Sequence, residues 1–159
     1  MEKNLEFLTK LNRICIILCH GGNFSFALFE KGICILHKSD HKYVTRKKAG
    51  KRQLAKDKSA NIHSMGSQIR RENEKNHQIA ISKILSENFE EIQKSEIILL
   101  QAPGINKLIL FEENKPLTLL KDKIRSICLT AKKANFVEIE EIFKVITKAY
   151  LIVKREDCE

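Results

Sequence analysis

The sequence lacks several features that would assign it to a familiar class of protein. Its five cysteines include no CxxC pair, and at least three of them lie in apolar runs, as small core residues do. The N-terminus lacks the continuous apolar stretch of a signal peptide, and no window approaches the roughly 20 apolar residues that a membrane span requires. These absences favour a soluble cytoplasmic protein in a reducing compartment, with no membrane partner.

Motifs of known catalytic chemistry are also missing. The sequence has no serine nucleophile elbow, Walker loop, dinucleotide fingerprint or pair of carboxylates at a recognisable spacing. The HGGN stretch at 20–23 is similar to an oxyanion loop, but its place between two apolar runs favours a hairpin turn. Cys34, His37 and His41 have a spacing that could suit zinc, yet structural zinc takes four ligands and no nearby pair completes the set. We therefore expect no metal and no cofactor.

The chain does carry a large positive charge, and most of it lies in one place. Its 159 residues fit a single domain, 1–159, that we expect to be monomeric, and Lys plus Arg total 29 against 20 acidic residues, a net charge of +9. Between His37 and Lys58 only Asp40 and Asp57 oppose a dense run of cations: Lys38, Lys42, Arg46, Lys47, Lys48, Lys51, Arg52, Lys56 and Lys58. Such a stretch indicates a polyanionic partner, with nucleic acid ahead of a membrane surface; the alternative is a merely tolerated basic surface.

Hydrophobic periodicity predicts an α/β fold with a mixed β-sheet packed by two long helices. Residues 13–37 form three apolar runs separated by Gly21-Gly22-Asn23 and Lys31-Gly32, which indicates an antiparallel meander. Periodicity then disappears, so residues 38–66 are predicted to be a long basic loop. A helix is predicted over 67–95, a buried strand over 96–102, a further apolar stretch in NKLILF and a strand over 123–130. A final helix begins at a capping box formed by Asn135 and Glu138.

Four stretches in order give a family resemblance: HGGNF, HKSDHKYVTRKKAGKRQ, HSMGSQIRRENE and RSICLTAKKANFVEIEEIF. Together they resemble the release-factor-like (VLRF-type) domain of the ankyrin-repeat and zinc-finger peptidyl-tRNA hydrolases, which act on stalled large ribosomal subunits. The resemblance covers residues 13–147. Its most specific positions are His37, Lys42, Tyr43, Thr45, Arg46, Ser64, Gly66, Arg70, Arg71, Asn73 and Glu74.

The resemblance implies a role for Gln53. In this family a glutamine preceded by small residues enters the peptidyl-transferase region and promotes release of the nascent chain. Gln53 occupies that position and Gly50 matches a glycine ahead of it, but Lys51 and Arg52 stand where the family has small residues. Two long cationic side chains prevent the close backbone approach that small residues allow, while they strengthen contacts to phosphate.

Two functions therefore remain open. The first is a ribosome-binding factor that occupies a tRNA site, a dormancy or inactivation factor with a degenerate catalytic tripeptide, in which the ankyrin repeats and zinc finger of longer relatives are absent. The second is an active peptidyl-tRNA hydrolase that uses Gln53 and releases nascent chains in ribosome quality control. A generic RNA-binding module is a weaker third reading.

In either leading case the partner is the ribosome, through its rRNA and tRNA-site region. The residues expected to contact RNA are Lys42, Arg46, Lys47, Lys48, Lys51, Arg52, Lys56, Arg70 and Arg71, with Gly50 and Gly66 shaping the loop. Arg70 and Arg71 are expected to open a helix capped by Ser67, beside phosphate. The alternative for these two arginines is a solvated pairing with Glu72 and Glu74.

Overall fold

A computed structural model describes residues 12–42, 62–111, 116–127, 131 and 133–147 of the chain. The elements, in order, are β1 (Arg13–His20), β2 (Asn23–Glu30), β3 (Ile33–His41), α3 (Ile62–Glu87), α4 (Phe89–Gln93), β4 (Ile97–Gln101), α5 (Ile105–Leu110), a 3-10 helix η1 (Pro116–Lys123), β5 (Ile124–Ser126) and α6 (Phe136–Thr147). No helix in the described ranges combines the length and apolar content needed to cross a bilayer.

The strands form one mixed sheet in the order β3-β2-β1-β4-β5. The first three strands are the predicted antiparallel meander, and β4 and β5 add in parallel on the other side of β1. Positive φ angles at Gly21 and Gly22, and again at Lys31 and Gly32, give both hairpins the two-residue turns that match the twist of the strands. The expectation that HGGN forms a hairpin turn is therefore confirmed.

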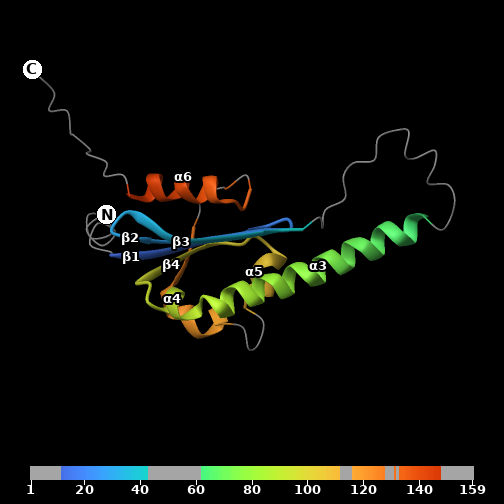
Figure 1. Ribbon diagram of the computed structural model, residues 1–159, viewed down its shortest axis with the longest axis horizontal. Helices are drawn as coiled ribbons and strands as arrows, with labels where there is room; N and C mark the ends of the chain where they lie inside the picture. The colour runs from blue at the N-terminus through green and yellow to red at the C-terminus, as the bar shows by residue number, and fades with distance from the viewer. Residues whose placement is uncertain (1–11, 43–61, 112–115, 128–130, 132, 148–159) are drawn as a thin grey trace, which may run out of the picture.

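Helices cover both faces of the sheet, as Figure 1 shows. The central strand β1 is buried on each side, so its side chains alternate between two cores. Cys15, Ile17 and Cys19 face α3, α4, α5 and η1, whereas the alternating residues of the same strand pack against α6. Burial raises the pKa of the Cys19 thiol to about 11, as expected for a core cysteine. The predicted α/β sandwich of a mixed sheet and helices is confirmed.

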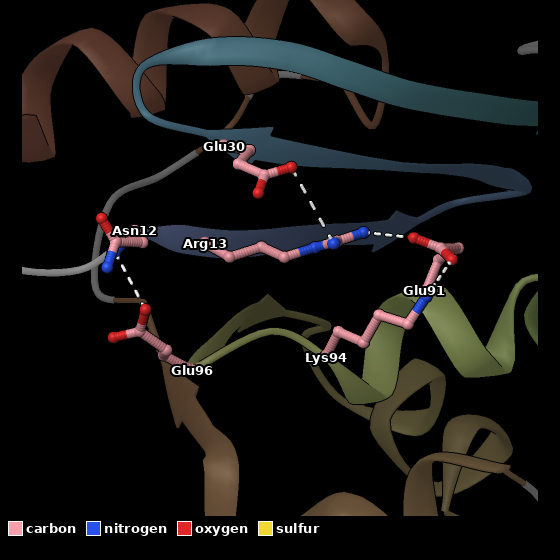
Figure 2. Close-up of polar contacts among 6 residues, drawn as sticks. All are labelled: Asn12, Arg13, Glu30, Glu91, Lys94 and Glu96. Carbon is pink, nitrogen blue, oxygen red and sulfur yellow. Dashed lines mark hydrogen bonds and ion pairs between the residues drawn. The ribbon is translucent and has the colours of Figure 1, made fainter.

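The N-terminal end of β1 is fastened by a polar cluster, drawn in Figure 2. Arg13, whose side chain is only 14% exposed, contacts Glu91 from α4 and lies 3.9 Å from the Glu30 carboxylate of β2. Lys94 Nζ donates to Glu91 Oε1 at 2.6 Å, and the backbone N–H of Asn12 donates to Glu96 at 2.9 Å. Hydrogen bonds from Lys94 and then from Arg13 hold the pKa of Glu91 below its usual value.

The expected loop over 38–66 is shorter at both ends than the sequence indicated. Strand β3 continues to His41, because its pairing with β2 extends to the Asn23–His41 pair. Helix α3 begins at Ile62, so Gly66 lies inside a helix and does not shape a loop, and Ser67 does not cap one. A single glycine costs a helix only about 1 kcal/mol relative to alanine, which a 26-residue helix with a buried C-terminal half tolerates. Residues 43–61 lie outside the described part of the chain.

Two helices near the C-terminus, α5 and α6, include residues that the sequence analysis singled out. The apolar stretch NKLILF forms the short helix α5, with Leu110 buried and Leu108 exposed. The predicted cap of the last helix is confirmed, because Asn135 Oδ1 accepts a hydrogen bond of 2.9 Å from the backbone N–H of Glu138.

Candidate nucleic-acid interface

The candidate interface lies where β3 ends and α3 begins. These two elements flank residues 43–61, and Figure 1 shows α3 extending well past the end of β3. Most of the predicted RNA-binding residues belong to that intervening segment and fall outside the described ranges: Arg46, Lys47, Lys48, Lys51, Arg52 and Lys56, together with Gly50 and Gln53. The described members of the set are Lys42, Arg70 and Arg71.

Lys42 is fixed by its backbone and leaves its ammonium group near solvent. Its backbone N–H donates to the carbonyl of Gly22, in the turn between β1 and β2, at 2.8 Å. This hydrogen bond continues the pairing of β3 with β2 one residue beyond His41. The side chain is 41% exposed, and Nζ lies 3.9 Å from Asp40 Oδ1. At that distance and exposure the pairing is weak, so the charge of Lys42 remains available to a phosphate.

The N-terminal part of α3 projects from the body of the protein. We call residues 62–76 the arm; at 1.5 Å per residue it is about 22 Å long. No residue from 68 to 76 is buried, and His77 is the first buried side chain that follows them. An α-helix that is polar nearly all round is typical of an element that meets solvent or a partner.

Arg70 and Arg71 lie on the arm, Arg70 half-buried and Arg71 exposed. Ion pairs within 4.0 Å to Glu72 or Glu74, the alternative left open by the sequence, are not found among the described residues. Arg70 is two helical turns before His77 and so shares the helix face that turns toward the sheet. Both guanidinium groups are therefore available to an anionic partner.

The contact that joins the arm to the sheet was not anticipated from the sequence. His77 Nδ1 lies 2.6 Å from Asp40 Oδ2, and the two side chains are 8% and 16% exposed. The sequence did contain a pattern that indicates this contact. His77, Ile81 and Leu85 are spaced four residues apart on one face of the helix, and Asp40 lies on the same face of β3 as Leu36.

The zinc candidates have other contacts, on the α6 side of the sheet. Cys34 Sγ lies 3.7 Å from the Leu36 carbonyl, and His37 Nε2 is 3.0 Å from Ser39 Oγ, with its ring 4.3 Å from the ring of Phe136. Ser39 in turn lies 2.9 Å from the buried Ser25 hydroxyl. Within the described ranges no group of three or more His, Cys, Asp or Glu side chains could hold a metal ion.

Curated proteins similar to this chain carry the name tRNA endonuclease. The chain is 31% identical to tRNA endonuclease vms-1 of Caenorhabditis elegans over 147 residues, which cover 90% of the chain and 24% of that protein. It is 33% identical over 117 residues to tRNA endonuclease vms1 of Schizosaccharomyces pombe, covering 69% of the chain and 19% of the relative. Human tRNA endonuclease ANKZF1 is 26% identical over 144 residues, 20% of its length. The chain thus spans a quarter or less of these relatives.

A solved structure shares the fold. The Vms1 mitochondrial localization core superposes with a TM-score of 0.61 at 16% identity, covering 89% of this chain and 58% of that one. Residues 14–154 match the family described as Bacteroidetes VLRF1 release factor, and this match includes the sheet, the arm, α6 and the basic segment between β3 and α3. The chain therefore belongs to the family of Bacteroidetes VLRF1 release factors, whose release-factor-like domain the sequence pattern had indicated.

Proposed function

We propose that this protein is a cytoplasmic ribosome-binding factor that places its basic segment, residues 43–61, in a tRNA site and holds the ribosome inactive. The observation that carries the proposal is the arm: a projecting helix whose Arg70 and Arg71 make no ion pair with an acidic residue in the described part of the chain, together with the partly exposed Lys42 at the end of β3. Both flank a segment that holds six further predicted phosphate contacts. Membership of a release-factor family supports the choice of the ribosome over RNA in general.

Lys51 and Arg52 favour occupation of the site over catalysis in it. A glutamine does not titrate, so Gln53 could act only by positioning water or by stabilising developing charge. Both tasks need its backbone close to the ester, and two long side chains directly before it oppose that approach. The same two cations add phosphate contacts, and so strengthen binding.

Cosedimentation with purified ribosomes at moderate salt tests the proposal. The wild-type protein should pellet with the large subunit, and a variant with Lys47, Lys48, Lys51 and Arg52 changed to glutamine should stay in the supernatant. A matched control changes four exposed cations outside the interface, Lys83, Lys107, Lys121 and Lys144, to glutamine, and it should pellet as the wild type does. The proposal fails if the wild type does not pellet, or if both variants behave alike.

A second function is favoured by the names of the relatives, tRNA endonucleases, and by the position of Gln53. On this reading the protein releases nascent chains from stalled large subunits. The test incubates wild type and Gln53→Ala with subunits that carry labelled peptidyl-tRNA, and it measures both the free peptide and the length of the tRNA. Peptide release by the wild type and not by Gln53→Ala would establish that the protein is an enzyme. Shortened tRNA would show that it cleaves the RNA, whereas tRNA of full length would show that it cleaves the ester bond between peptide and tRNA. No product with either protein would leave site occupation as the function.

A further inference from the structure

The Asp40–His77 contact lies at the root of the arm. His77 is 6% exposed and follows residues 68–76 of α3, none of which is buried, and Asp40 is the second-last residue of β3. The contact therefore joins the end of β3 to the residue of α3 that directly follows the arm. Lys42 follows two residues after Asp40, so the other end of the basic segment is fixed at the same place.

The chemistry of the pair is directional. An ionised carboxylate only accepts, so the 2.6 Å contact requires a proton on His77 Nδ1 that points at Asp40 Oδ2. His77 Nε2 is buried and has no hydrogen-bond partner in the described part of the chain. Lys42 from β3 faces the pair, with its Nζ 3.9 Å from the other Asp40 oxygen, and along α3 the residues that follow on the same stripe, Ile81 and Leu85, belong to the hydrophobic core. His77 is thus held by one hydrogen bond of fixed direction.

Such a pair is poorly explained by stability alone. Burying a carboxylate and an imidazole costs desolvation energy, and two packed apolar side chains at these positions would often be as stable or more so. What the polar pair adds is a preferred geometry, because a hydrogen bond weakens when the angle between donor and acceptor changes, whereas apolar contacts tolerate sliding.

We infer that Asp40 and His77 are positioning residues that set the angle of the arm relative to the sheet, and so place Arg70 and Arg71 for contact with RNA. The RNA half of this inference rests on the proposed function; the angle of the arm does not. Arg70 lies seven residues, or about 10 Å, beyond His77, and the tip of the arm lies about 22 Å beyond it. A tilt of about 10° at the contact moves Arg70 by about 2 Å and the tip by about 4 Å, enough to break a hydrogen bond to phosphate.

Residual dipolar couplings of backbone amides measure the angle of the arm without any RNA. The couplings of residues 68–76 are compared with those of β1, β2 and α6 in the wild type, in His77→Leu and in the double variant Asp40→Leu/His77→Leu. The double variant removes the hydrogen bond without leaving an unpaired buried group, so it keeps the test valid if His77→Leu fails to fold. We expect the arm couplings to change in both variants while those of the sheet and α6 do not.

Conservative substitution separates positioning from a general structural role. Asp40→Asn retains an oxygen that accepts from His77 Nδ1, so its arm couplings should match those of the wild type. Lys83→Ala, on the same helix but in an exposed pair with Glu87, should likewise leave them unchanged. Unchanged arm couplings in the double variant would overturn the inference, and so would an Asp40→Asn protein whose arm turns as far as that of the double variant.

Ribosome binding is measured on the same proteins. We expect the double variant to bind about four- to fivefold more weakly, as for one lost phosphate contact at about 0.15 M salt, and Asp40→Asn to bind as the wild type does. If the wild type does not bind ribosomes, the proposed function fails, while changed couplings still support the control of the arm angle. If the wild type binds and the double variant binds equally well with an altered arm, the positioning role is refuted and the proposed function stands.

Discussion

Replacing Arg70 and Arg71 together by alanine should reduce the salt dependence of ribosome binding by an amount that can be worked out in advance. Alanine keeps the helix, because it has the highest helix propensity, and neither arginine has an acidic partner that the change would leave unpaired among the described residues. The variant therefore removes two charges from the arm without a compensating local gain.

The magnitude follows from counterion release. Each phosphate contact contributes about 0.7 to 0.9 to the slope of log affinity against log salt, so two contacts contribute about 1.4 to 1.8. Extrapolated from 1 M salt, where this contribution vanishes, to about 0.15 M, the loss amounts to roughly 15- to 30-fold in affinity. The experiment is cosedimentation with ribosomes across a series of salt concentrations, with circular dichroism to confirm the helix content.

A matched control removes the same charge elsewhere. Lys83 and Lys144 are exposed, lie on α3 and α6 outside the arm, and each pairs with a glutamate three or four residues away. Lys83→Ala/Lys144→Ala should leave the slope within about 0.3 of the wild-type value. Equal slopes for the two double variants would refute the assignment of the arm as an RNA contact, because net charge alone would then explain the binding.

Other outcomes follow from burial and from the Arg13 cluster. Leu85→Ala should lower the free energy of unfolding by about 2–5 kcal/mol, because the side chain is fully buried, whereas Leu108→Ala should lower it by less than about 0.5 kcal/mol, because Leu108 is 69% exposed. Urea titration measures both values, and equal losses would contradict the packing described above. In the folded protein at neutral pH, Cys19 should react slowly with iodoacetamide, because burial raises the pKa of its thiol to about 11 and only about one molecule in ten thousand carries the thiolate. Labelling of Cys19 as fast as in denaturant would contradict this prediction. Glu91→Gln should lower the free energy of unfolding at neutral pH, because the pKa of Glu91 in the folded protein lies below its unfolded value. The difference in stability between variant and wild type should disappear as the pH falls through the folded-state pKa. A difference in stability that persists in strong acid would contradict this prediction.

The parts of the fold that were predictable have local causes. The two hairpins follow from Gly21-Gly22 and from Gly32, because glycine accepts the positive φ angles of a two-residue turn without steric cost. The start of α6 follows from the Asn135 cap, which is encoded within four residues. Apolar runs of strand length likewise indicated β1 and β4, although their parallel pairing depends on the whole topology.

The parts that were missed depend on contacts distant in sequence. Gly66 and the serines at 64 and 67 are weaker helix formers than alanine, and α3 extends through them because its C-terminal half is anchored by Ile81 and Leu85. The Asp40–His77 contact joins residues that are 37 positions apart in the sequence. From the sequence alone, polar residues at these two positions are expected to face solvent, because nothing local shows that β3 and α3 pack together. The basic segment was located by charge, while its conformation stays a prediction.

The central position of β1 has a consequence for how freely the basic segment can change. The N–H of Asn12 bonds to Glu96, 84 residues later, so the sheet is completed only by closing a very long stretch of chain that contains this segment. The entropy of loop closure grows slowly, by about 0.6 kcal/mol for each doubling of length, so inserting or deleting residues between β3 and α3 alters that cost little. A change in the length of the chain between these two elements therefore carries little cost in loop-closure entropy, which would let one scaffold accept segments of different lengths at this place.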